Sequence, residues 1–436
     1  MAGGAISASS VLAAQPVRVT VNPTQVNFGA IPVGSEASKV VSVTNESSAD
    51  VAVTQDEFRA PDDISPGFGT CPSVVVVVLT PGMSCTVEVH FNPSEFFAGE
   101  NQVGTLAVFV SDPSTGAVLD KVVVTVRGKG LSRAGPGSVL ATISVGDTPA
   151  WLAIDQRTGD VYVANIFSDD VSVIDGQTNL VVATIPLAGG NECAHPFGVG
   201  YDKRTDIVYV SCQQYVKVTA IDGKTRSVLG EPIEVGSSPF GVALNERNGN
   251  VYIAVAHPDW VAVLDGATHQ VIHTIQLGTS SMPFGIAYDG QNGDLYVANS
   301  QIADVTVIDG RTDAVKTTIT MPSPSLGIAY ARPTNTLFVA NYYANAVSVI
   351  DGRTNQVTAT IPMGAFPIGV AFNERDGNIY VADSSGVKVI DVSTNTVVRT
   401  IPLAGGAVGV AAHPMTGNIY ATNGRGNSVT VISPAR

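Results

Sequence analysis

The chain is poor in charged residues, aromatic residues and cysteine. Only 14% of its 436 residues are charged and 6% are aromatic. It has no run of eighteen apolar residues, which argues against a membrane-spanning helix. No stretch keeps a 3.6-residue apolar period, which argues against a helical fold. The chain is instead rich in turn formers, with 44 Gly and 25 Pro, and this composition predicts an all-β protein.

The charge balance and the missing motifs narrow the function classes. The chain has 23 basic and 37 acidic residues, a net charge of −14. Since an acidic surface repels phosphates, we expect no nucleic-acid partner. The sequence has no Cys-x-x-Cys pair, no metal-binding histidine spacing and no Gly-x-Ser-x-Gly elbow. We therefore predict no metal, no cofactor and no catalytic residue, and an enzyme is the less favoured class.

The four cysteines form two groups. Cys71 and Cys85 lie in the first part of the chain, and Cys193 and Cys212 lie in the second. Pairs within one domain favour a secreted, periplasmic or cell-surface location over the reducing cytosol. The Ala/Ser-rich residues 1–16 are interpreted as a flexible arm or the remnant of a secretory signal.

Residues 17–130 predict a β-sandwich. Eight short runs of mostly alternating apolar residues, separated by Gly, Pro, Asn and Ser, span residues 17–21, 26–29, 38–45, 51–55, 73–79, 85–91, 104–111 and 121–128. This number of strands in about 115 residues is typical of an immunoglobulin-like domain. A Gly/Pro/Ser-rich linker follows at residues 131–137.

This first domain resembles the ASH/MSP-like immunoglobulin domains of bacterial surface proteins, those called choice-of-anchor D. The matching segments are residues 27–29, 33–34, 44–45, 79–85, 89–93 and 127–130. The resemblance implies an accessory or interaction module rather than an enzyme. It also implies a disulfide between Cys71 and Cys85, because family members often pair the cysteines that flank the Leu-x-Pro-Gly turn.

Residues 138–433 contain seven copies of one pattern. A Pro-x-Gly-like strand start recurs at Pro149, Pro196, Pro239, Pro283, Ser325, Pro367 and Ala407, at spacings of 40 to 47 residues. Each copy has four period-2 runs, of which 341–372 shows the boundary between two copies most clearly. Four short antiparallel strands per repeat predict a seven-bladed β-propeller.

The two ends of the repeat region are complementary. The last copy stops at its third strand, residues 429–432, and the missing fourth type stands at residues 138–143. We expect these two strands to pair in one blade, which closes the ring and covers exposed strand edges. The region resembles the YVTN family of surface propellers in residues 162–165, 296–299, 339–341 and 380–383, and in its Ile-Asp-Gly turns. The resemblance implies an extracytoplasmic location and no particular chemistry.

Several recurring residues have a structural interpretation. The Asp-Gly-x-Thr segments are interpreted as hairpin turns rather than metal or phosphate elements. Asn at the end of the second strand is interpreted as a loop cap. Trp151 replaces a glycine that recurs in the other six repeats, and we expect it to plug the central channel or, as the alternative, to mark a pocket. Cys193 and Cys212 should meet across paired strands, although two separate buried thiols are the alternative.

The loops between second and third strands, and those between blades, should share one face. We name this the loop face and expect it to bind protein or glycan, because its sequence diverges while the strands stay similar. The candidate binding residues on this face are Phe167, Asp169, Asp170, His195, Tyr215, His257, Asp259, Trp260, Tyr342, Tyr343 and Arg425.

Two other functions remain open at this point. One is a propeller lyase or hydrolase with an axial site near His195 and His257. The other is a structural subunit that self-associates by strand addition through the sandwich edges or residues 1–16. The favoured function is a non-enzymatic binding or adhesion scaffold.

Overall fold

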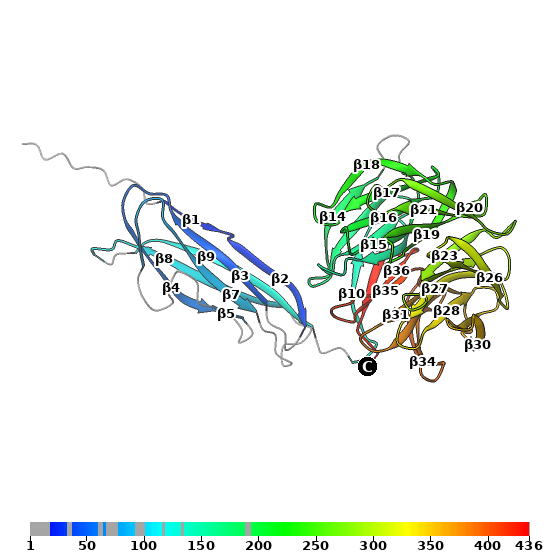
Figure 1. Cartoon of the computed structure of the whole chain (residues 1–436). Helices are drawn as coiled ribbons and strands as arrows, with labels where there is room; N and C mark the ends of the chain where they lie inside the picture. The colour runs from blue at the N-terminus through cyan, green and yellow to red at the C-terminus, as the bar shows by residue number, and fades with distance from the viewer. Residues whose placement is uncertain are drawn as a thin grey trace, which may run out of the picture. The chain divides into compact units, whose positions relative to one another are not determined.

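The computed structural model describes residues 18–32, 37–59, 64–66, 77–91, 101–115, 118–131, 135–187 and 193–435. In these ranges the chain forms strands and turns without any helix, so no helix there could cross a membrane. The chain splits into two compact units, Met1–Arg133 and Ala134–Arg436 (Figure 1).

The first unit consists of two sheets, with strand orders β1-β3-β7-β5 and β2-β9-β8-β4-β6. Its strands are β1 (Val19–Asn22), β2 (Gln25–Pro32), β3 (Ala37–Asn45), β4 (Val51–Arg59), β5 (Ile64–Pro66), β6 (Val77–Leu79), β7 (Ser84–Phe91), β8 (Asn101–Ser111) and β9 (Val118–Leu131). Alternate residues of paired strands, such as Val41 and Val43 on β3 and Val87 and Val89 on β7, are buried in one core. This alternation is the reason the sequence predicts the sandwich, which the structure confirms.

One disulfide prediction falls partly outside the described residues. Cys85 lies on β7 and is buried in the sandwich core. Cys71 lies outside the described residues, so its pairing with Cys85 stays a prediction.

The second unit is a propeller of seven four-stranded antiparallel sheets, the blades. Blade 1 is β11 (Pro149–Ile154), β12 (Val161–Asn165), β13 (Asp170–Asp175) and β14 (Leu180–Pro186); blade 2 is β15 (Pro196–Asp202), β16 (Ile207–Cys212), β17 (Lys217–Asp222) and β18 (Ser227–Glu234). Blade 3 is β19 (Ser237–Leu244), β20 (Asn250–His257), β21 (Trp260–Asp265) and β22 (Val271–Gln276); blade 4 is β23 (Pro283–Tyr288), β24 (Asp294–Asn299), β25 (Asp304–Asp309) and β26 (Ala314–Thr320). Blade 5 is β27 (Ser325–Ala331), β28 (Thr336–Asn341), β29 (Ala346–Asp351) and β30 (Gln356–Pro362); blade 6 is β31 (Pro367–Asn373), β32 (Asn378–Asp383), β33 (Gly386–Asp391) and β34 (Thr396–Pro402).

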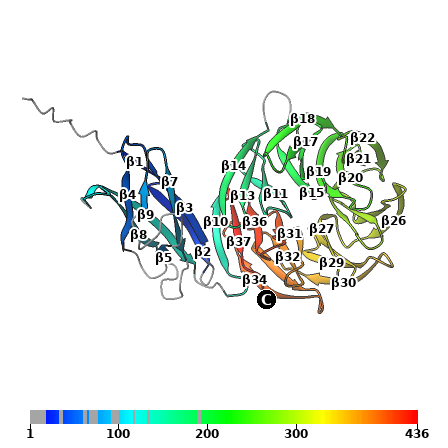
Figure 2. The ribbon, with the colours of Figure 1, turned by 60° about the vertical axis from the view of Figure 1, so that its left-hand side comes forward.

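Blade 7 closes the ring with strands from both ends of the propeller. It contains β35 (Val410–Ala412), β36 (Ile419–Asn423), β37 (Ser428–Ile432) and β10 (Val139–Ser144). β10 lies beside β37 (Figure 2). The two strands pair antiparallel, with Ile143 opposite Val429. The predicted closure is therefore confirmed, and the closing strand lies one residue further along than the predicted 138–143.

The second and third strands of each blade form the core. All five residues of β12 are buried, and the pattern recurs in the other blades. Both faces of these strands pack against the neighbouring blades, which is why their sequences are almost continuously apolar. The outer strands bury little except one isoleucine near their end, such as Ile185 on β14.

The recurring glycine of the first strand has a steric cause. Strand pairing shifts register after the strand-opening residue, for example between Pro196 and Val199, so the x-Gly dipeptide bulges. A Cβ on Gly198 would overlap the carbonyl oxygen of Phe240 in the next blade. The same overlap with the next blade recurs at five further glycines: Gly241, Gly285, Gly327, Gly369 and Gly409. At these six positions the inner strands are therefore packed backbone against backbone, and only glycine fits.

The recurring tyrosine of the second strand connects adjacent blades. The Tyr162 hydroxyl donates to the Gly223 carbonyl of the next blade at 2.9 Å. Across the ring closure, the Tyr420 hydroxyl donates to Asn179 Oδ1 of blade 1 at 2.7 Å. Burial raises the pKa of Tyr162 to about 12, so the phenol remains a hydrogen-bond donor at neutral pH.

The Asp-Gly-x-Thr segments are hairpin turns. Asp222 Oδ1 accepts the backbone N–H groups of Lys224 at 2.9 Å and Thr225 at 2.7 Å. These hydrogen bonds, foremost that from Thr225, lower the pKa of Asp222. The carboxylate thus stabilises its own turn, as the sequence predicts.

Candidate binding site

The loop face of the propeller combines residues that stabilise loops with residues that line a groove. It is formed by the connections between second and third strands and by those between blades. Antiparallel pairing places both kinds of connection at the same end of each blade. The sequence-predicted residues on this face divide into those two groups.

Asp169 and Asp259 stabilise the blade connections. Both have a positive φ, 52° and 68°. Asp169 Oδ1 accepts the backbone N–H of His195 at 2.8 Å. Asp259 accepts the N–H groups of Ser280 at 2.9 Å and Met282 at 2.7 Å. Their carboxylates cap these loops, which gives both residues a structural role.

Asp170 and Trp260 also make structural contacts. Asp170 Oδ1 accepts a hydrogen bond from the Asn165 amide at 2.6 Å, so Asn165 contacts a side chain of the paired strand β13. The Trp260 indole donates to the Val235 carbonyl at 2.9 Å and packs against the core of blades 2 and 3. Removing this indole would therefore disturb the fold as well as the surface.

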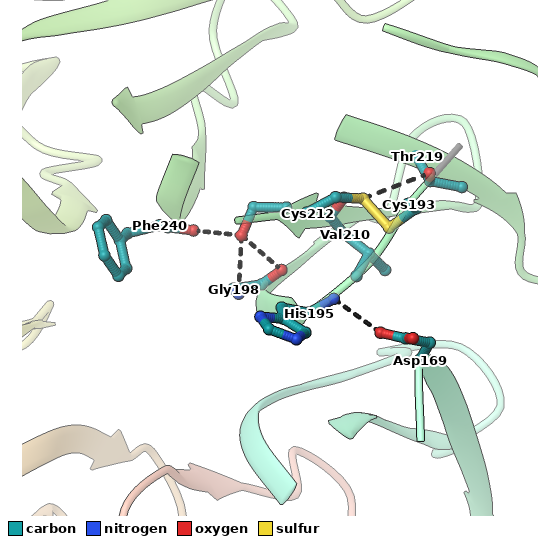
Figure 3. The surroundings of a disulfide bond; sticks show 9 residues. Asp169, Cys193, His195, Gly198, Val210, Cys212, Thr219 and Phe240 are labelled. Atoms are coloured by element: carbon teal, nitrogen blue, oxygen red, sulfur yellow. Dashed lines mark hydrogen bonds between the residues drawn. A yellow bond between two sulfur atoms is a disulfide. The ribbon is translucent and has the colours of Figure 1, made fainter. Parts of the chain in front are cut away.

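The predicted disulfide between Cys193 and Cys212 is present (Figure 3). Both residues are buried, and their Cα atoms are 5.1 Å apart. The bond ties the blade 1–blade 2 connection to the end of β16. His195, two residues after Cys193 in the sequence, packs edge-on against the exposed ring of Phe167, with the ring centroids 5.5 Å apart.

Tyr215 and His257 lie apart from any cluster. Tyr215 is half-buried and His257 is exposed at the end of β20. Within the described residues, neither the His195 nor the His257 ring is hydrogen-bonded to a carboxylate. The axial histidine site therefore gains no support from these residues.

A groove of about 680 Å³ lies on the loop face over blades 5, 6 and 7 and the start of blade 1. It brings together two sequence-predicted residues, Tyr342 and Arg425, from loops of blades 5 and 7. The other lining residues are Asp147, Thr148, Phe366, Ile368, Ser384, Gly405, Ala407, Val408, Gly424 and Asn427. Its volume is within the range of ordinary small-ligand sites.

An aromatic platform forms one end of this groove. The rings of Tyr342 and Phe366 are stacked, with centroids 5.0 Å apart and an interplanar angle of 29°. Tyr343 packs edge-on against Tyr342 and is 69% exposed. Phe366, in the connection between blades 5 and 6, is 43% exposed. Large exposed rings cost solvation energy, which makes this platform a candidate contact surface.

Polar groups line the remainder of the groove. Arg425 is exposed in the turn between β36 and β37, and within the described residues its guanidinium forms no ion pair. Asp147 is also exposed and accepts the Thr148 hydroxyl at 3.1 Å. Asn427 Oδ1 accepts the Thr148 N–H at 3.1 Å and so caps this loop as Asp169 does in blade 1. One cation and several hydrogen-bonding groups thus share the groove with the aromatic platform.

Sequence reasoning missed Phe366, Asp147 and Ser384. Phe366 stands just before the strand-opening Pro367, the position that His195 occupies in its own repeat. Ser384 follows Asp383 as Tyr342 follows Asn341. Aligning the repeats at these two positions would have revealed Phe366 and Ser384. Asp147 carries no such signal, because only the closed ring brings its loop beside Arg425.

Trp151 lies in the central channel. Its ring contacts those of Phe197 at 4.9 Å and Phe284 at 5.4 Å, on the inner strands of blades 2 and 4. Phe240 completes this aromatic half by packing on Phe284 at 4.6 Å. A cavity of about 180 Å³ remains beside these rings. The cavity and the groove share no lining residue.

His413 is a buried structural residue. It ends the first strand of blade 7, where other blades have Asp155, Asp202, Asn245, Asp289 and Asn373. Its Nδ1 accepts the N–H groups of Met415 and Thr416, both at 3.2 Å, as Asp155 Oδ1 accepts that of Arg157 at 2.7 Å. Such acceptance requires a neutral ring with its proton on Nε2.

We expect His413 to make propeller stability depend on pH. Burial lowers the pKa of His413 below its usual 6.5, so the unfolded chain takes up this proton more readily than the folded one. Stability should fall as pH drops below about 6.5, by at most about 1.4 kcal/mol per pH unit. His413→Asn should remove this slope. Urea unfolding at pH 7.5 and 5.5 tests the expectation.

The exposed His257→Asn provides the matched control, which should keep the wild-type slope. An unchanged slope in His413→Asn would contradict the structural role of the neutral imidazole.

Within the described ranges, no group of three or more His, Cys, Asp or Glu side chains is arranged to hold a metal ion. On the loop face, Asp169 and Asp259 accept backbone N–H groups, while Asp170 and Asp147 accept from side chains. The arrangement is suited to reversible contact by stacking, hydrogen bonding and one exposed cation.

Comparison with known proteins supports both parts of the fold. Residues 17–115 match the ASH family, described as Abnormal spindle-like microcephaly-assoc'd, ASPM-SPD-2-Hydin. Among solved structures, the chain is similar to Kuenenia stuttgartiensis Hydrazine Synthase, at 16% identity and a TM-score of 0.59. That likeness covers 67% of this chain and 97% of the other, and at this identity it shows the fold alone. No curated protein matches the chain.

Proposed function

We propose that this chain is a non-enzymatic, extracytoplasmic binding scaffold of the YVTN type, in which the loop-face groove holds the partner. The observation that carries the proposal is the groove itself, with the Tyr342–Phe366 platform at one end and the exposed Arg425 among its lining residues. Aromatic rings and arginine are the side chains most often central to binding surfaces.

The rest of the molecule agrees with this role. The propeller strands are nearly uniform and form a rigid core, while the groove is made from loops that differ between repeats. The disulfide between Cys193 and Cys212 suits an oxidising compartment. The ASH-like unit is of a type associated with protein interaction and would act as an accessory module.

The dimensions of the groove favour a glycan over a protein surface. A concave, half-open site of about 680 Å³ has room for a small oligosaccharide, whereas stable protein interfaces are usually broad. The apolar face of a sugar ring fits against a flat aromatic pair, and its hydroxyls can pair with Asp147, Ser384 and Asn427.

Glycan-array binding by the full chain, followed by calorimetry on the retained sugars, tests this function. Tyr342→Ala combined with Phe366→Ala should weaken binding at least about tenfold, because both rings of the platform are removed. Phe167→Ala is the matched control, since Phe167 is an exposed aromatic ring on the same face that does not line the groove. Equal binding by the double variant and wild type would show that the groove is not the site.

A further inference from the structure

We propose that the groove recognises a sugar unit that carries a carboxylate, as in uronic or sialic acids, with Arg425 as the residue that selects the acid. The inference rests on the proposed function and specifies its ligand class. In this arrangement the sugar ring lies on the Tyr342–Phe366 platform, and its carboxylate lies toward Arg425.

Arg425 is available for such a ligand. Its side chain lines the groove, is exposed, and forms no ion pair with the described residues. Arg226 of the propeller, in contrast, is already paired with Asp160, at 2.6 Å. A planar guanidinium offers two parallel N–H donors, a geometry that matches a carboxylate.

The surroundings select against polyanions. Asp147 lines the same groove, and the whole chain carries a net charge of −14. A heavily sulfated chain or a nucleic acid would meet repulsion both locally and at long range. A ligand with a single carboxylate beside neutral hydroxyls gains from Arg425 and avoids most of that repulsion.

The groove provides partners for the remaining sugar groups. Asp147 presents a carboxylate acceptor to hydroxyls. The Asn427 oxygen caps Thr148, and its amide nitrogen donates to no other described residue, so it can donate to a ligand. Gly405 and Gly424 line the wall, where the missing side chains leave room for a ring. Apolar Ile368 and Val408 complete the lining.

Calorimetry with matched sugars tests the inference. The probes are galacturonic acid, its neutral methyl ester, sialyllactose, lactose and a sulfated disaccharide. We expect an acidic probe to bind wild type at least about tenfold more tightly than its neutral partner. Arg425→Gln should lose that preference while still binding the neutral sugar. Arg425→Lys should restore only part of it, because the bidentate geometry is lost.

The outcomes separate the inference from the proposed function. Equal binding of acid and neutral partner by wild type, with loss in Tyr342→Ala, overturns acid selection and leaves glycan binding intact. Acid preference that survives in Arg425→Gln also overturns the inference. If the sulfated probe binds most tightly, the assignment of a carboxylate ligand is overturned in favour of another anion. If none of the probes binds, or if only a protein partner binds, the proposal of a glycan ligand is overturned.

Discussion

Gly285→Ala is expected to lower the unfolding free energy of the propeller by about 2–4 kcal/mol, because the new methyl group cannot be accommodated. Its Cβ would overlap the Leu326 carbonyl oxygen and come within 3.3 Å of the Gly327 Cα. Both obstacles are backbone atoms of the neighbouring inner strand. They cannot rotate away as a flexible side chain can, so the strands themselves would have to separate.

Gly290→Ala in the same blade is the matched control. Gly290 has only the end of the Arg332 side chain near its Cβ position, at 3.8 Å, and its φ is not in the left-handed region. This variant should be neutral or slightly more stable, because alanine restricts the unfolded chain more than glycine does.

Urea unfolding followed by fluorescence compares the two glycine variants. Both tryptophans and all 12 tyrosines lie in the propeller, so the signal reports this unit alone. Equal stability of Gly285→Ala and Gly290→Ala would refute the steric account of the glycine ring.

Removing the disulfide with Cys193→Ala and Cys212→Ala should cost about 3 kcal/mol. The cysteines are 19 residues apart in sequence, and closing a loop of that size restricts the unfolded chain by roughly this amount. Both cysteine side chains lie in the buried core between blades 1 and 2, so alanine is the least disruptive replacement. The urea midpoint from fluorescence measures the effect.

Reducing agent supplies the internal control for the disulfide. It should bring wild type close to the double variant and leave the double variant unchanged. A double variant with the wild-type midpoint would mean that packing alone holds the blade connection.

The candidate site could be predicted only in part. The sequence identified the loop face and placed Tyr342 and Arg425 among eleven candidate residues on it, because these loops differ between repeats. It also proposed Asp169, Asp259 and Trp260, for which the structure shows loop-stabilising contacts. A polar side chain in a loop looks the same in sequence whether it faces a ligand or caps a neighbouring backbone. The distinction depends on which N–H groups lie within reach.

The sequence by itself determined the architecture, because each blade repeats one local sequence pattern. Period-2 strands, Asp-Gly turns and one glycine per inner strand recur at spacings of 40 to 47 residues, and the displaced strand near residue 139 implies closure. Only the tertiary structure decided which loops meet. Tyr342, Phe366 and Arg425 are separated by up to 83 residues and come from different repeats. Their convergence follows from the curvature of the closed ring, a property of blade packing that no single repeat encodes.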